Sequence, residues 1–169
     1  VNHNSRKFHA KNTDPNRTHW NVEYCNEDIK DVYHELFDDA LKRYNDKQTR
    51  KDRKIDDYYE KIRSGKQEKL FHEVILQIGD KDNMGSETME GQLAAKILDE
   101  YMKGFQERNP TLRVFAAHLH LDEATPHLHI DFIPYVTGSK RGLDTRVSLK
   151  SALAAEGFTG GTRGATELN

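Results

Sequence analysis

Four histidines fall within twelve residues of one stretch of this sequence, and imidazole is a versatile metal ligand. They belong to two His-Leu-His triplets in the segment AAHLHLDEATPHLHIDFIPY, which runs from 116 to 135. Because alternate residues of a strand share a face, each triplet would project both of its imidazoles to one side. If the two strands pair as a hairpin, imidazoles on facing strands lie about 5 Å apart. The spacing therefore predicts a metal site on one face of a sheet.

All four imidazoles share the predicted face, and three of their nitrogens could converge on one cation, so His118, His120, His127 and His129 are all candidate ligands. The face argument leaves open which three would bind. Three protein ligands leave coordination positions for substrate and water, which is typical of catalytic rather than structural sites. Glu123, between the strands, could be a further ligand or a general base. Asp122 is interpreted as a turn former, and Asp131 could orient a ligand imidazole.

The surrounding elements must hold this hairpin in a sheet. Strands are expected over 18–24, 70–78, 112–121 and 127–136, from alternating or continuous apolar residues. Helices are expected over 28–45, 86–108 and 148–155, and the highly charged segment 46–69 reads as a mostly solvated helix or as a charged linker. In the helix over 86–108, apolar residues recur at every fourth position: Met89, Leu93, Ile97, Tyr101 and Phe105. The expected fold class is α+β, an antiparallel sheet with helices packed on one face and the histidines on the opposite face.

The charge balance permits a nucleic-acid partner without requiring one. The net charge is −2, and basic residues gather in two regions, from Arg6 to Arg17 and from Lys140 to Lys150. If these regions meet in space they form a positive site, and Lys140 and Arg141 are therefore predicted DNA contacts. Trp20 could stack on a base, although core packing is the more ordinary role for a tryptophan.

Composition also suggests a compartment and a domain plan. The single cysteine, Cys25, suits a reducing compartment, and no apolar run approaches the ~20 residues that span a bilayer. A bacterial cytoplasmic location is expected. We expect one catalytic domain over residues 1–169, as the N-terminal part of a longer chain whose remaining C-terminal region could form a dimer.

The segment from His120 to His129, HLDEATPHLH, resembles the HxDExxPHxH motif of plasmid mobilisation relaxases of the MobV (Mob/Pre) type. Its His-Leu-His end is similar to the signature of the wider HUH endonuclease superfamily. The segment HNSR, from His3 to Arg6, resembles the family's HNxR motif. A third segment, NRTHWNVE from 16 to 23, resembles the family's R-x-H-x-N-Y-E motif, with Val22 in place of the tyrosine. The three segments follow the family's order.

The resemblance implies a metal-dependent enzyme with a relaxase-like palm that nicks one DNA strand at a plasmid transfer origin and later rejoins it. It implies His3 as the nucleophile, with a covalent phosphohistidine link to DNA, and Arg6 and Glu123 as its catalytic partners. It further implies that Arg17, His19 and Asn21 contact DNA or support the site. The implied partner is single-stranded or supercoiled DNA. Because the family motif begins at His120, the resemblance implies His120, His127 and His129 as the metal ligands and leaves the role of His118 open. The implied cofactor is Mn²⁺ or Mg²⁺, and the imidazoles could also accept Zn²⁺ or Ni²⁺.

Three other functions remain open at this point. The chain could be a replication initiator of the HUH type, with a tyrosine such as Tyr58 or Tyr59 as nucleophile. It could be a metal-bound nucleic-acid-binding module without catalysis. The histidines could also bind a structural metal, which predicts metal-dependent folding and no DNA affinity.

Overall fold

A computed structural model describes residues 13–159, and these residues form an α+β fold with a five-stranded antiparallel sheet. Four strands lie in the order β1 (Val22–Asn26), β3 (Leu112–His120), β4 (His127–Val136) and β2 (His72–Gln77), and the short β5 (Arg146–Val147) pairs with β4. In the antiparallel pairing of β1 with β3, Glu23 lies opposite His118. The predicted fold class and the two histidine-bearing strands are confirmed.

Five α-helices complete the described chain: α1 (Ile29–Asp46), α2 (Tyr58–Ser64), α3 (Met89–Lys103), α4 (Phe105–Arg108) and α5 (Leu149–Ala155). Four of them, α1, α2, α3 and α5, have an N-cap side chain. An oxygen of Asp28, Asp57, Thr88 or Ser148 accepts a hydrogen bond from a backbone N–H in the first turn of its helix. Two 3₁₀ turns, η1 (Thr18–Trp20) and η2 (Lys51–Arg53), occupy loops. No helix in residues 13–159 is long and apolar enough to cross a membrane.

The chain divides into two compact units, each with its own interior. The first contains the chain up to Glu27 together with Glu73–Arg108 and Val114–Phe132. The second contains Asp28–His72, Asn109–Arg113 and the chain from Ile133 onward. The expectation of one catalytic domain over 1–169 stays a prediction.

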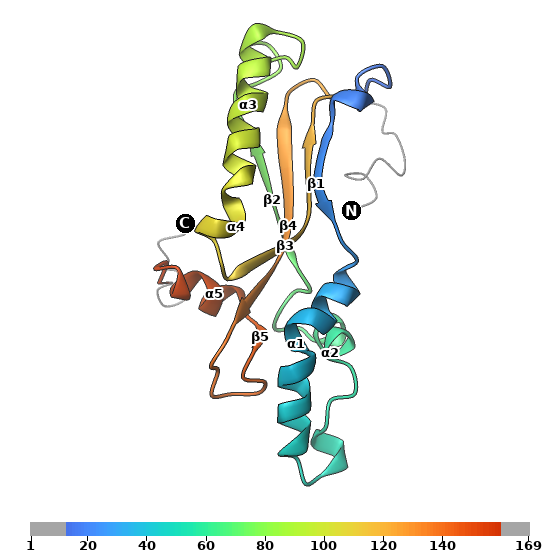
Figure 1. Ribbon diagram of the computed structural model, residues 1–169, viewed down its shortest axis with the longest axis vertical. Coiled ribbons are helices and arrows are strands. Elements are labelled where there is room, and N and C mark those ends of the chain that lie inside the picture. Colours follow the sequence, from blue (N-terminus) through green and yellow to red (C-terminus); the bar gives the residue numbers. More distant parts are fainter. Residues whose placement is uncertain (1–12, 160–169) are drawn as a thin grey trace. The chain divides into compact units, whose positions relative to one another are not determined.

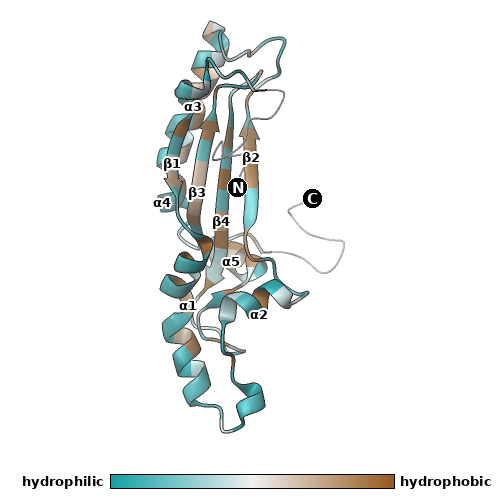
Figure 2. Cartoon of the chain, turned by 90° about the vertical axis from the view of Figure 1, so that its right-hand side faces the viewer, coloured by the Kyte–Doolittle hydropathy of each residue, from teal (hydrophilic) through white to brown (hydrophobic). Residues whose placement is uncertain are grey.

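In the first unit, α3 covers one face of the sheet. The Tyr24 hydroxyl on β1 donates a 2.8 Å hydrogen bond to Asp99 on α3, and the Phe105 ring on α4 lies 6.5 Å from that of Phe132 on β4. Strand alternation places Leu128 and Ile130, both fully buried, on the same side as Phe132. The histidine positions therefore belong to the opposite face, as predicted. Figure 1 shows α3 beside the strands, and Figure 2 looks onto the face away from that helix.

The second unit is built around packed tyrosine and phenylalanine rings. The Phe37 ring lies 5.1 Å from Tyr33 and 5.0 Å from Tyr58. The hydroxyl of Tyr33 donates to the Leu70 carbonyl oxygen at 2.7 Å, and the hydroxyl of Tyr58 accepts from the Val147 N–H at 3.2 Å. These bonds satisfy the polar ends of aromatic side chains whose bodies are buried.

Several predicted boundaries are wrong for identifiable reasons. The segment expected as a strand over 18–24 begins with η1, and β1 starts only at Val22. The charged segment 46–69 holds only η2 and α2, because the Asn45 side chain exchanges two hydrogen bonds with the backbone of Ile55 and fixes a loop there. The helix expected over 86–108 ends at Lys103, and Gly104 separates it from α4. Strand β5 was not predicted.

The apolar stripe of α3 faces outward. Met89 and Leu93 are 87% and 59% exposed, and Ile97 and Tyr101 are exposed as well. The buried face of α3 instead carries small and aliphatic residues: Gly91, Ala94, Ala95, Leu98 and Met102. A side chain at Gly91 would collide with the backbone of Gly85, so the close approach of the preceding loop selects glycine on this face. The spacing of the stripe thus identified the helix but not its buried side.

Candidate active site

Three imidazole rings form a nearly equilateral triangle on the first unit's sheet. The ring centroids of His120 and His127 are 5.3 Å apart, those of His120 and His129 are 5.2 Å apart, and those of His127 and His129 are 5.1 Å apart. Imidazole nitrogens about 2.1 Å from a shared ion would hold their rings at about this separation. The rings that the sequence predicts as ligands are therefore gathered at a distance suited to a cation.

Hydrogen bonds orient two of these rings from behind. His129 Nδ1 lies 2.7 Å from Glu73 Oε1, and His127 Nδ1 lies 2.9 Å from the Thr125 carbonyl oxygen. Each bond occupies Nδ1, so Nε2 is the nitrogen that could bind a cation. A carboxylate or carbonyl behind a ligand imidazole also selects its tautomer and raises its basicity.

The donor set fits a transition-metal ion by chemistry and by separation. Imidazole nitrogen suits Zn, Fe, Ni and Cu, while carboxylate oxygen suits Mn and Mg, and the carboxylate of Glu123 lies 3.8 Å from His127 Nε2. Within residues 13–159, however, no group of three His, Cys, Asp or Glu side chains is arranged so that it could hold a metal ion.

His118 has a different partner from the other three. Its ring stacks parallel to that of His120 at 6.1 Å, and its Nε2 lies 3.1 Å from Glu23 Oε2 on β1. The carboxylate of Glu23 is mostly exposed, whereas the His118 side chain is buried. His118 therefore lies beside the triangle and contacts the edge strand β1. The predicted face holds three imidazoles close together, with the fourth next to them.

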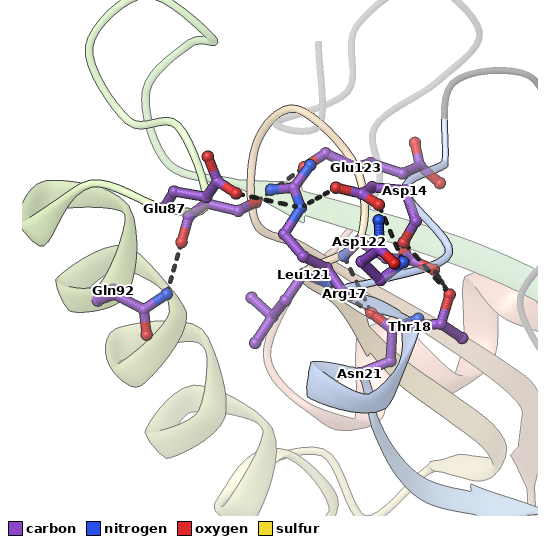
Figure 3. A network of polar contacts seen from close by, with 11 residues as sticks. Asp14, Arg17, Thr18, Asn21, Glu87, Gln92, Leu121, Asp122 and Glu123 are labelled. Carbon is purple, nitrogen blue, oxygen red and sulfur yellow. Dashed lines mark hydrogen bonds and ion pairs between the residues drawn. The ribbon is translucent and has the colours of Figure 1, made fainter.

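The loop between β3 and β4 is anchored by the segment that precedes β1 (Figure 3). The side-chain oxygen of Asn21 accepts from the backbone N–H groups of Leu121 and Asp122, at 2.7 and 3.1 Å. The Asp14 N–H donates to the Asp122 carbonyl oxygen at 2.7 Å, and the Thr18 hydroxyl donates to the Asp122 carboxylate at 3.2 Å. Asp122 is fully buried, so it anchors the loop instead of only shaping a turn.

The segment before α3 holds the other side of the same loop. The Ser86 hydroxyl donates to the Glu123 carbonyl oxygen at 2.9 Å, and the Ser86 N–H donates to the Ala124 carbonyl oxygen at 3.2 Å. The Gln92 side chain in turn donates to the Ser86 carbonyl oxygen. These bonds hold the backbone of Glu123, whose side chain borders a cavity of about 350 Å³ also lined by Ile75, Gln77, Ala124, Thr125, His127 and His129.

The predicted DNA contacts occupy varied positions. Arg17 is mostly buried and pairs with Asp14 at 3.1 Å and with Glu87 at 3.8 Å, while His19 is exposed and touches Trp20 edge-on. Arg17 and Asn21 therefore belong to the loop anchor described above. Lys140 and Arg141 lie in the second unit, between β4 and β5, and are exposed. The predicted catalytic residues His3 and Arg6 lie outside the described residues.

One expectation about a side chain is wrong, and one residue near the site was not predicted. Trp20 is 37% exposed, so core packing is not its role. Glu73 was not singled out from the sequence, although it alternates with Val74 on β2 and so faces the histidine side. Alternation along β2 is enough to predict that Glu73 lies on that face. Its contact with His129 depends on β2 and β4 being neighbours in the sheet.

Comparison with known proteins gives a consistent result. A family described as plasmid recombination enzyme (Mob_Pre) matches residues 2–155. Among solved structures, the Mn-bound MobM relaxase domain (MOBV; Mob_Pre) with plasmid pMV158 oriT DNA of 22 nucleotides, at pH 5.5, is 27% identical with a TM-score of 0.50, and the match covers 89% of this chain and 66% of that one. A Mn-bound structure of the same domain with 23 nucleotides, at pH 6.5, is 26% identical with a TM-score of 0.45, covering 90% and 66%.

The chain thus spans about two thirds of the MobM relaxase domain that it matches. No curated protein sequence matches it. The family match extends over nearly the whole chain and includes all three motifs as well as the histidine hairpin. The chain belongs to the plasmid recombination enzyme family, Mob_Pre.

Proposed function

We propose that this chain nicks one strand of DNA at a plasmid transfer origin, in a reaction that depends on a divalent cation, and later rejoins that strand. The observation that carries the proposal is the triangle of His120, His127 and His129 with the Glu123 carboxylate beside it. Family membership supports it, as does the likeness to a relaxase domain that is bound to oriT DNA and Mn.

The three imidazoles would hold Mn²⁺ or Mg²⁺ through ring nitrogens, which are the Nε2 atoms in His127 and His129. Once bound, a divalent cation polarises the scissile phosphate and stabilises the negative charge that develops on it. Glu73 and the Thr125 carbonyl would keep the His129 and His127 rings in place during this step. The burial of His120 and His129 would keep bulk water from competing for these nitrogens.

The proposed nucleophile is His3. Its neutral imidazole nitrogen attacks the phosphorus, a nitrogen–phosphorus bond forms, and the bond from phosphorus to the 3′ oxygen breaks. The leaving oxygen takes up a proton and becomes a 3′ hydroxyl, while the 5′ phosphate stays on the histidine. Glu123 would accept the imidazole proton or fix the tautomer, and Arg6 would neutralise a phosphate oxygen. Because the covalent link retains the energy of the broken bond, the reverse attack by a 3′ hydroxyl reseals the strand.

The tyrosine alternative is weakened by the packing of Tyr58. Its hydroxyl is bonded to the Val147 N–H, and burial raises its pKa above the ordinary value. A buried phenol with a raised pKa is a poor nucleophile at neutral pH. Tyr59 is half-buried, and its ring packs edge-on against Tyr33 in the same aromatic cluster.

A nicking assay tests the proposal directly. Supercoiled plasmid carrying a candidate transfer origin is incubated with Mn²⁺ and the parent chain, His3→Ala, His127→Ala or His34→Ala. His34 is an exposed histidine on α1 and serves as the matched control. We expect the parent and His34→Ala to nick the plasmid and to form an acid-labile protein–DNA adduct. The His3→Ala and His127→Ala variants should show neither nicking nor the adduct. Nicking that survives His3→Ala would move the nucleophile elsewhere. DNA binding without nicking by the parent would favour the non-catalytic module.

We further infer a bacterial cytoplasmic location, where plasmid DNA resides, with single-stranded or supercoiled DNA as the partner. A dimer formed through a C-terminal region beyond this chain remains a prediction. Sedimentation of a longer chain beside this one would test it, since only the longer chain should sediment as a dimer.

A further inference from the structure

A cavity of about 820 Å³ lies within the second unit, formed by three stretches that are distant in sequence. Helix α2 and the residues after it supply Lys61, Lys66 and Glu68, and the segment from the β4–β5 loop into β5 supplies Arg141 and Arg146. Four basic side chains and one acidic side chain therefore face the same space. The charged segment 46–69, which matches none of the family motifs, contributes half of these cations.

Within residues 13–159, the four basic side chains Lys61, Lys66, Arg141 and Arg146 form no ion pair. Several other basic residues of this unit do, including Arg43 with Asp144 at 2.8 Å, Arg63 with Glu60 at 2.7 Å and Arg113 with Glu35 at 3.1 Å. Uncompensated like charges repel one another, so their convergence on one cavity suits an anionic ligand.

Backbone features hold the two arginines in position. Gly142 has φ of +70°, a conformation that favours glycine, and it turns the chain directly after Arg141. The Ser139 hydroxyl donates to the Arg141 carbonyl oxygen at 3.0 Å and accepts from Arg146 Nε at 3.0 Å. The Arg146 bond uses only Nε, so the two terminal nitrogens of the guanidinium remain able to donate to a ligand. The loop that supplies the two arginines is therefore conformationally constrained.

We propose that this cavity binds the phosphodiester backbone of DNA, as a second contact made by residues separate from the nicking site. The inference rests on the proposed function, since it takes DNA as the ligand. Phosphate oxygens accept from both lysine and arginine, and a flexible lysine pair opposite a held arginine pair can follow a backbone without reading its sequence. Such contacts add affinity that falls steeply as salt rises.

Fluorescence anisotropy with a fluorescein-labelled duplex oligonucleotide of arbitrary sequence tests the inference. Affinity is measured at several salt concentrations in EDTA, so that the cation site does not contribute. The test protein is Lys61→Gln/Lys66→Gln/Arg141→Gln. The control is Lys51→Gln/Arg53→Gln/Lys54→Gln, which removes the same charge from exposed, unpaired residues of the same unit outside the cavity lining.

We expect the cavity variant to lose about tenfold or more in affinity near physiological salt, and its slope of log affinity against log salt to fall by about 2–3, because each lost phosphate contact removes about 0.9. The control should keep both values close to the parent. The charge-preserving variant Lys61→Arg/Lys66→Arg/Arg141→Lys should bind like the parent. If the triple variant unfolds, Lys61→Gln and Lys66→Gln singly should each lower the slope by about 1.

Equal losses in the cavity variant and the control would overturn the inference, since diffuse charge would then explain the binding. An unchanged slope in the cavity variant would overturn it as well. The result is independent of nicking. A parent chain that binds DNA but cleaves no plasmid would refute the proposed function, whereas DNA binding by the cavity would still be tested by the affinities of the cavity variants.

Discussion

At the scale of single residues, the candidate site depends on the groups behind its imidazoles. Glu73 on β2 holds His129 from the side away from the triangle, at 2.7 Å. Such a carboxylate selects the tautomer that presents Nε2 and strengthens that nitrogen as a donor. Its contribution should appear in metal affinity even though Glu73 is not itself a proposed ligand.

We therefore expect Glu73→Ala to weaken Mn²⁺ binding by about 10- to 100-fold, as measured by isothermal titration calorimetry. Glu73→Gln, which keeps an acceptor but not the charge, should lose less. Glu107→Ala on α4 removes an exposed carboxylate from the same unit and should bind as the parent does. Equal affinity in the parent and Glu73→Ala would show that His129 is oriented by packing alone.

Asn21 acts at the same scale through the hairpin loop. Its side-chain oxygen accepts from two backbone N–H groups, so Asn21→Ala should leave both donors without this partner. We expect a loss of about 1–3 kcal/mol in the free energy of unfolding, measured in urea. Asn26→Ala, at the exposed end of the following strand β1, is the control and should cost well under 1 kcal/mol. An unchanged stability for Asn21→Ala would mean that water replaces its two bonds.

At the scale of elements, one polar cluster ties α3 to the edge of the sheet. Asp99 accepts from the Tyr24 hydroxyl at 2.8 Å and pairs with Lys103 at 2.7 Å. Hydrogen bonds from Lys103 and then from Tyr24 lower the pKa of Asp99 below 3.8. A lowered carboxyl pKa in the folded state contributes stability that is present above the unfolded pKa and is lost as pH falls through the folded pKa.

Asp99→Asn should therefore cost about 1 kcal/mol at pH 7 and clearly less at pH 3, measured by urea unfolding at both values. Tyr24→Phe should lower stability at pH 7 as well, and the two changes should not add, because they remove one shared bond. Glu100→Gln, an exposed neighbour 3.4 Å from Lys103, should have little effect at either pH. A cost for Asp99→Asn that is equal at the two pH values would contradict the charged role of Asp99.

At the scale of the whole molecule, metal binding should stabilise a chain that is already folded. Mn²⁺ at about 100 times its dissociation constant contributes about 2.7 kcal/mol. For a chain of this size we expect Tm to rise by about 5 °C or more in differential scanning fluorimetry. His127→Ala should abolish the rise and His34→Ala should keep it. If the chain treated with EDTA lacked the native circular dichroism spectrum, the structural-metal alternative would be the better account.

The fold also shows which features local sequence patterns can predict. Alternation in two strands and a short turn between them predicted that the histidines share a face, and the fold confirms it because both patterns are properties of neighbouring residues. The apolar repeat of α3 predicted a helix correctly, yet its stripe from Met89 to Tyr101 is exposed. Helix formation depends on local sequence, whereas the buried side depends on what approaches the helix, here the loop at Gly85.

Residue types at short, regular spacing are enough to predict the α+β class, the hairpin, three candidate ligands and the family. The pairing of His118 with Glu23 and the hydrogen bond between Glu73 and His129 are known only from the folded chain. Folding alone brings the cations of α2 and the β4–β5 loop around one cavity. These contacts join residues more than fifty positions apart, and no local pattern encodes which distant segment will become a neighbour.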